Sequence, residues 1–288
     1  MENTLAYTKK KKSVLPTILK IALIIFVLFI TYSPLIIIAL MSVDKDPTAT
    51  SFTGFTFRWY KELFSDSELM GIIIKNTVLV AVIATICSTI FGTITAIGIH
   101  SLNKKRRGRM IMLNNVPILN ADIATAILLF IVFQVIGVIL QIDESNRLNY
   151  FTLVLSHIFF STPYVVLSVL PKLGEIDKNL YDAALDLGCK PRKAILKVII
   201  PAIKTGIFTG AMLAFTMSID DFVISYMVGG STQNFSTWFY ARRKITKNFP
   251  VQKACAYNTL LTLITITCLI VYNIIKKKKE KSVKWKNY

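Results

Sequence analysis

The stretch Lys172–Lys204 reads KLGEIDKNLYDAALDLGCKPRKAILKVIIPAIK and forms a polar segment between two hydrophobic blocks. Outside it, the chain has the character of a membrane protein, because 53% of the 288 residues are hydrophobic and they come in long runs. A run of about 20 apolar residues crosses the hydrocarbon core of a bilayer. The sequence therefore predicts an all-α polytopic membrane protein with six transmembrane helices, at about 17–41, 72–100, 110–138, 150–171, 205–228 and 254–275.

The net charge of +18 is distributed unevenly along the chain. If six helices alternate through the bilayer, one side carries 24 of the 34 Lys and Arg residues. The positive-inside rule makes that side cytoplasmic, together with both termini. Attraction to anionic lipid headgroups explains this charge better than nucleic acid does. We expect a basic cytoplasmic tail (1–16), a six-helix domain (17–275) in the cell membrane and a second basic cytoplasmic tail (276–288).

Several kinds of catalytic or cofactor-binding motif are missing from the sequence. It holds no Walker-type glycine loop, so the chain cannot hydrolyse a nucleotide by that route. It also holds no GxSxG or HExxH motif and no cluster of Cys and His. His100 and His157 are isolated, and we interpret both as ordinary helix residues. We expect no catalytic residues, no metal and no cofactor.

The polar segment has the pattern of two short helices joined by a turn. Ile176, Leu180, Ala183 and Leu187 are spaced as one helical face. Gly188 is suited to end that helix in a left-handed conformation, and a proline follows at 191, where a second helix would begin. Small residues at the middle of the first helix allow a partner to approach closely. The pattern fits a docking helix, and it also fits an ordinary interfacial helix.

The same segment resembles the EAA loop of ABC-importer permeases. The resemblance rests on Asp182-Ala183-Ala184, then Gly188 four residues later, and Val198-Ile199-Ile200-Pro201 after nine more. In that family the loop forms coupling helices that sit in a cleft on the cytoplasmic ATPase subunit. The resemblance implies an ATPase-coupling role for Asp182, Ala183, Ala184, Gly188 and Pro201. Asp182 departs from the usual Glu but keeps its charge.

Three further segments are similar to the spermidine/putrescine permeases, in particular their C-type subunit. They are Gly54–Tyr60, Pro117–Ile123 and Phe215–Ser225, and the resemblance runs from about residue 30 to 265. It implies the type I fold of ABC-importer permeases and a transport subunit that works by alternating access. The implied partners are ABC ATPase subunits, a second homologous permease and an extracellular or periplasmic polyamine-binding protein.

Acids within the predicted spans are candidates for the substrate path, because ionisable groups are costly in a bilayer. Away from the span ends, only Asp122, Asp220 and Asp221 qualify. Counted from the cytoplasmic ends of their spans, Asp122 and Asp220 lie about 20 and 24 Å deep at 1.5 Å per residue. We expect the path to include these acids with Ser218 and Trp59. In the alternative interpretation, one acid of the adjacent pair caps or solvates a helix break near Gly229-Gly230, and Trp59 belongs to an interfacial aromatic belt.

The predicted function is that of a transmembrane permease subunit in an ATP-driven importer for spermidine or putrescine. Other solutes of the same class of importer remain open at this point, among them ferric iron, thiamine and sugars. An ion-driven secondary transporter and a membrane scaffold without transport are more distant alternatives. Arg242, Arg243 and Lys244 depart from the positive-inside pattern, and we expect them to contact acidic residues of the substrate-binding protein.

Overall fold

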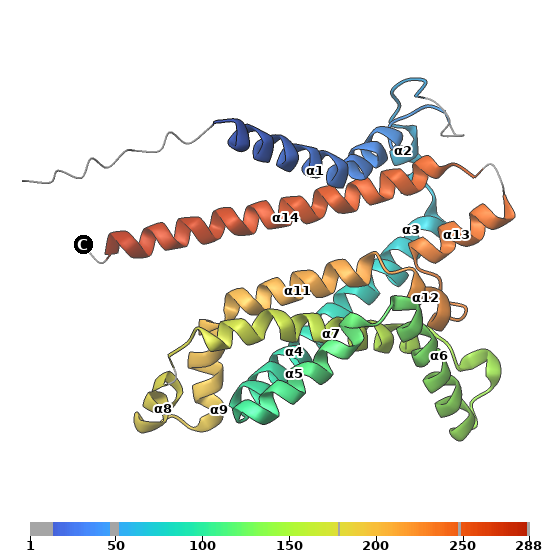
Figure 1. The fold of residues 1–288 in the computed structure, drawn as a ribbon. Coiled ribbons are helices and arrows are strands. Elements are labelled where there is room, and N and C mark those ends of the chain that lie inside the picture. The colour runs from blue at the N-terminus through green and yellow to red at the C-terminus, as the bar shows by residue number, and fades with distance from the viewer. Residues whose placement is uncertain (1–13, 47–51, 178, 247–248, 287–288) are drawn as a thin grey trace, which may run out of the picture. The chain divides into compact units, whose positions relative to one another are not determined.

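A computed structural model describes residues 14–46, 52–177, 179–246 and 249–286 (Figure 1). Within these ranges the regular elements are helices, and the only extended pairing is an isolated bridge between Asp44 and Phe55. The predicted basic cluster at 9–12 lies outside the described residues. The all-α prediction is confirmed.

Five described helices are long and apolar enough to cross a membrane, and a sixth span results if one bent pair of helices counts as a single span. The bend between the members of that pair is 74°. The five spans are Leu19–Met41, Ser67–Ser101, Asp122–Ile139, Tyr150–Gly174 and Val251–Tyr272, and the bent pair is Pro191–Ala202 with Lys204–Ile219.

The chain divides into two compact units, 1–63 with 248–288 and 64–247. In the first unit, helix α1 (Val14–Met41) packs against α14 (Val251–Lys286). A loop after α1 leads into the short helix α2 (Arg58–Ser65). The second unit contains the polar segment Lys172–Lys204 and all the candidate acids.

The second unit is built on three helices that pack against one another: α4 (Leu79–Ser101), α7 (Tyr150–Gly174) and α11 (Lys204–Ile219). Small residues let their backbones approach, as is usual between membrane helices. A Cβ added at Gly92 of α4 would lie 2.6 Å from Cβ of Val165 on α7. One added at Gly210 of α11 would lie 3.1 Å from Cα of the same valine. Val165 is therefore held between two glycines on different helices.

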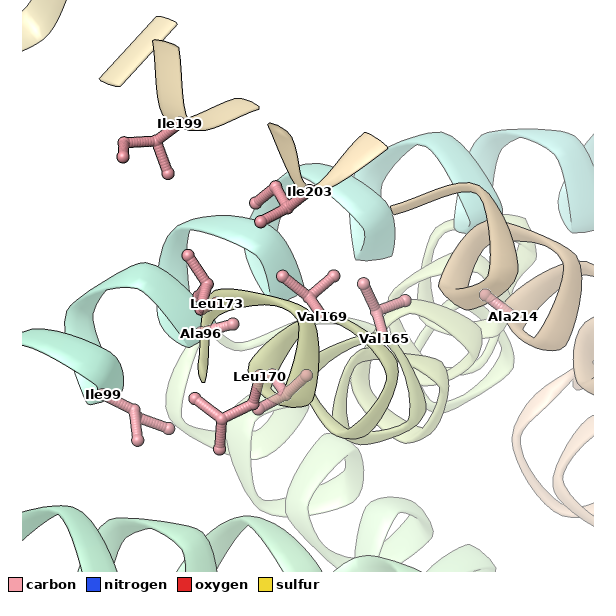
Figure 2. Close-up of a cluster of buried hydrophobic side chains, with 10 residues drawn as sticks. Ala96, Ile99, Val165, Val169, Leu170, Leu173, Ile199, Ile203 and Ala214 are labelled. Atoms are coloured by element: carbon pink, nitrogen blue, oxygen red, sulfur yellow. The ribbon is translucent and has the colours of Figure 1, made fainter. Parts of the chain in front are cut away.

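Around this valine lies a cluster of buried apolar side chains, shown in Figure 2. It draws Ala96 and Ile99 from α4, five residues of α7 and Ala214 from α11. Ile199 and Ile203, from the bent segment that leads into α11, complete it. The core thus extends from the long helices to the end of the polar segment.

The third predicted span, 110–138, is wrong as one continuous helix. The structure divides it into α5 (Lys104–Leu119) and α6 (Asp122–Ile139). Asn120 and Ala121 between them are extended, with ψ of 147° and 138°. Pro117 removes a backbone donor from the last turns of α5. Asp122 is therefore the first residue of a helix, and the depth counted along an unbroken helix does not apply to it.

The fifth predicted span, 205–228, is also interrupted. Helix α11 ends at Ile219, and the short α12 (Val223–Val228) follows after a break at Asp220–Phe222. Helix α12 packs against α6 and α7. Outside the polar segment, the second unit also has α3 (Ser67–Gly71) and the π-helical η1 (Ile72–Val78) before α4, the 3-10 turn η2 (Glu144–Asn146) before α7, and α13 (Phe235–Ile245).

Candidate functional site

The polar segment folds as the two short helices that its sequence predicts. Helix α8 (Asn179–Asp186) ends at Gly188, which has a φ of +81°. The amides of Gly188 and Cys189 donate to the carbonyls of Leu185 and Ala184 at 2.8 and 3.1 Å, the pattern of a Schellman cap. Pro191 then starts α9 (Pro191–Ala194), and the chain continues through the π-helical η3 (Ile195–Ile199) and α10 (Ile200–Ala202).

Helix α8 presents a strip of three exposed apolar residues. Leu187 is 86% exposed and Leu180 37% exposed, and Ala183 between them is also exposed. Asp182 and Asp186 of the same helix are exposed as well. We call Leu180, Ala183 and Leu187 the α8 strip. It presents apolar surface with a small residue at its centre.

Ala184, next to Ala183 on α8, is only 7% exposed. The two adjacent alanines of the motif therefore differ: Ala183 faces outward, and Ala184 is packed within the protein. On the same inner side, Tyr181 packs against the buried cluster of Figure 2, as does Ile176 just before α8. Helix α8 and the residues before it are therefore in contact with the core of the second unit.

Next to α8 is a cavity of about 610 Å³. Its lining comes from the ends of α4 and α7, from α8 with the residues before it, and from η3, including His100, Leu173, Asp177, Tyr181 and Ile195. Pro201 is exposed on α10, close to the 74° bend that leads into α11. The five predicted coupling residues thus lie on one helix–turn–helix segment, in different environments.

Two of the three predicted path acids are exposed at helix breaks. Asp122 is the first residue of α6, where the helix dipole favours a negative charge. Asp220 follows the last residue of α11. Among the residues that the structure describes, the Asp220 carboxylate has neither a hydrogen bond nor an ion pair.

Asp221 and Ser218 have a different environment. The Asp221 side chain is 9% exposed, and its carboxylate accepts hydrogen bonds from the start of α12. Ser218 is 2% exposed, with its hydroxyl 2.6 Å from Nδ1 of His157. His157 therefore belongs to a polar network, which its isolation in the sequence did not indicate. Asn234 joins the same network from the residue before α13.

Trp59 belongs to the first compact unit and not to the unit that holds the acids. It lies on α2 and is 3% exposed. Its indole nitrogen donates to the backbone carbonyl of Asp44 at 2.6 Å. Arg58 stacks over its ring, with the guanidinium carbon 5.3 Å from the ring centroid.

The cationic run at the end of α13 is also divided. Arg242 pairs with Glu68 of α3 at 3.1 Å and lies over the ring of Trp238. Arg243 and Lys244 are exposed, and neither has an ion pair among the described residues. Two of the three charges thus remain available to a partner.

Sequence relatives of this chain are polyamine permeases. It is 27% identical over 249 residues to a spermidine/putrescine transport system permease protein PotC of Haemophilus influenzae, which covers 86% of this chain and 93% of that protein. It is 30% identical over 201 residues to the putrescine transport system permease protein PotI of Escherichia coli K12, with 69% and 70% covered. A PotC homolog of Mycoplasma genitalium is 29% identical, with 74% of each chain covered.

Solved structures confirm the fold. A bacterial alginate ABC transporter in complex with its alginate pentasaccharide-bound periplasmic protein matches with a TM-score of 0.63 at 15% identity, covering 88% of this chain and 91% of that chain. An amino acid ABC transporter matches with a TM-score of 0.56 at 14% identity, covering 78% and 100%.

A family model covers most of the chain. The model that describes the binding-protein-dependent transport system inner membrane component matches residues 88–285. That range includes the helix–turn–helix segment, both acidic helix breaks and the exposed charges of α13. This chain belongs to the family of binding-protein-dependent transport system inner membrane components.

Proposed function

We propose that this chain is a permease subunit of an ATP-driven importer for polyamines, spermidine or putrescine. It works in the cell membrane with both termini in the cytoplasm, and it has no ATPase site of its own. The relatives named above support the substrate class, because PotC and PotI proteins are named as spermidine and putrescine permeases.

The observation that carries the proposal is the exposed carboxylate of Asp220 at a break between apolar helices. An unpaired acid at such a site is energetically costly, and it is therefore a candidate for a functional residue. A polyamine carries ammonium groups spaced along a methylene chain, so a few separated carboxylates suit it. Asp122, at the other helix break, offers a second one. Few carboxylates also allow release, which transport requires.

The energy source is a separate ATPase that docks on the α8 strip. Closure of the ATPases moves α8, and Tyr181 and Ile176 pass this movement to the buried cluster between α4, α7 and α11. A second, homologous permease completes the path, and a polyamine-binding protein delivers substrate on the outer side.

Uptake in cells that lack this chain tests the proposal. Complementation with the wild-type chain should restore uptake of labelled spermidine or putrescine, and removal of ATP should abolish it. Thiamine, ferric iron and sugars should not compete with the label. Competition by one of these solutes, or transport by the purified chain in liposomes without an ATPase, would contradict the proposal.

A further inference from the structure

A chain of hydrogen bonds lies at the break between α11 and α12, centred on His157 of α7. The imidazole is 1% exposed. Its Nδ1 lies 2.6 Å from the hydroxyl of Ser218 on α11, and its Nε2 lies 3.0 Å from the hydroxyl of Ser225 on α12. One side chain of α7 therefore bridges the two helices on either side of the break.

The carboxylate of Asp221 is fully engaged in the same network. Its Oδ2 accepts hydrogen bonds from the amide and the hydroxyl of Ser225, at 2.7 and 2.8 Å, and its Oδ1 accepts from the amide of Ile224 at 3.2 Å. Amides of the first helical turn have no partner within the helix, so this carboxylate caps α12. The side-chain amide of Asn234 donates to the backbone carbonyl of Asp221 at 2.7 Å and to the Ser225 hydroxyl at 2.8 Å.

One assignment of protons satisfies every contact in the network. A neutral imidazole with its proton on Nε2 donates to Ser225, and its bare Nδ1 accepts the proton of the Ser218 hydroxyl. Ser225 in turn donates its own proton to Asp221. Each donor has one acceptor in this arrangement. A fully satisfied buried network of this kind fixes a single local geometry.

Helix α7 also holds the far end of α12. The Thr152 hydroxyl donates to the carbonyl of Val228 at 3.1 Å. Gly230 follows with a φ of +57°, and a Cβ added there would lie 2.2 Å from the carbonyl oxygen of Leu148. A larger residue at 230 would therefore push the chain away from the start of α7. Side chains of α7 therefore bond both to the end of α11 at the break and to the short helix after it.

Asp220 is excluded from this network although it is adjacent to Asp221. Its backbone amide still bonds to Thr216, which keeps it at the end of α11. Its side chain is exposed and has no partner among the described residues. The same break thus holds one carboxylate that is used internally and one that is free to take a ligand.

We infer that the two adjacent acids have different tasks: Asp220 contacts the cationic substrate, and Asp221 with His157, Ser218, Ser225 and Asn234 is a positioning group that holds the α11–α12 break so that Asp220 faces the path. The inference rests on the proposed polyamine transport for the task of Asp220. We call this positioning group the clamp, and the thermal stability of the protein measures it independently of transport.

Paired substitutions separate charge from hydrogen bonding. At 220 the negative charge itself is needed, so Asp220→Asn and Asp220→Ala should reduce polyamine uptake equally, by at least about tenfold, with an unchanged melting temperature. At 221 hydrogen-bond acceptors are needed, so Asp221→Asn should keep several-fold more uptake than Asp221→Ala. The alanine variant should also lower the melting temperature of the purified importer complex.

The same logic applies to the imidazole. His157→Gln offers an acceptor and a donor on one side chain, whereas His157→Phe keeps the bulk and offers neither. Uptake and melting temperature should both be higher for the glutamine variant. Each uptake value is divided by the amount of chain in the membrane, so that poor insertion is not counted as poor transport.

The outcomes distinguish the two proposals. If the wild-type chain takes up no polyamine, the proposed function fails, and the melting temperatures still decide the clamp. If the wild type transports polyamines and Asp221→Asn is as inactive as Asp220→Asn at an unchanged melting temperature, Asp221 acts through its charge and the inference fails. Equal behaviour of His157→Gln and His157→Phe in both measurements would overturn the role of His157.

Discussion

The indole nitrogen of Trp59 donates a hydrogen bond of 2.6 Å to the backbone carbonyl of Asp44, which lies 15 positions earlier in the chain. The bond ties α2 to the end of α1 in the first compact unit. Tyr60 adds a second tie, with its hydroxyl 2.7 Å from that of Ser42. Trp59 and Tyr60 of α2 are therefore both bonded to residues that directly follow α1.

Trp59→Phe keeps most of the ring and removes the donor. The Asp44 carbonyl would then lose its partner in a buried environment, which costs about 1–3 kcal/mol. We expect a lower melting temperature of the purified complex, whereas the exposed Phe57→Leu should change little. Uptake that falls for Trp59→Phe at an unchanged melting temperature would instead assign Trp59 to the substrate path.

Acid pH should loosen the same unit. Hydrogen bonds from Thr53, first from its amide, hold the pKa of Asp44 below its ordinary value. Burial alone would raise the pKa of Glu62, but hydrogen bonds and charges from Arg58 and Lys253 outweigh it and lower that pKa. A carboxyl with a lowered pKa stabilises the folded state above its unfolded pKa, about 4, and loses this contribution as the pH falls through its folded pKa.

The expected melting temperature is therefore constant between about pH 7 and pH 5 and falls below about pH 4, the unfolded value. The double variant Asp44→Asn with Glu62→Gln should start lower at pH 7 and decline less steeply. Thermal unfolding of both proteins across this range measures the effect. Parallel curves would show that these two carboxyls do not contribute.

The sequence correctly predicted the helix ends that depend on single residues and their immediate neighbours. Gly188 and Pro191 mark the end of one helix and the start of the next, and the structure has both. The break at Asn120–Ala121 was not predicted, because the apolar run continues through it and hydropathy alone shows no gap. Pro117, three residues earlier, was the available signal.

Long-range contacts explain what the sequence did not indicate. Ser218 and Ser225 lie 61 and 68 positions after His157, so only the packing of α7 against α11 and α12 makes them partners. The alternative interpretation placed a capping acid at a helix break near Gly229-Gly230. The structure has the break earlier, at Asp220–Phe222, and there Asp221 caps the start of α12. Which of the two does so depends on the direction of each side chain, and their adjacency carries no such information.

Docking of the binding protein should depend on the exposed charges of α13. Arg243→Glu combined with Lys244→Glu should reduce crosslinking to the binding protein by about tenfold at low ionic strength, and less at high salt. Glu68→Gln breaks only the exposed pair with Arg242, which contributes little to stability, and serves as the control. Equal crosslinking of the double variant and wild type would remove these residues from the docking surface.

The ATPase partner should contact the α8 strip at Ala183 and should not contact Ala184. Ala183→Arg forces a charge into a close contact, and loss of a central contact of this kind costs about 2 kcal/mol or more, roughly 30-fold in affinity. We expect the ATPase to be lost on co-purification while the melting temperature of the chain is unchanged. Ala183→Ser, small and neutral, is the matched control and should keep the ATPase bound. The variant Ala184→Asp should also fail to bind the ATPase, but because the chain itself unfolds, since the side chain at 184 is packed inside the protein. Normal co-purification of the ATPase with Ala183→Arg would exclude the strip as the docking surface.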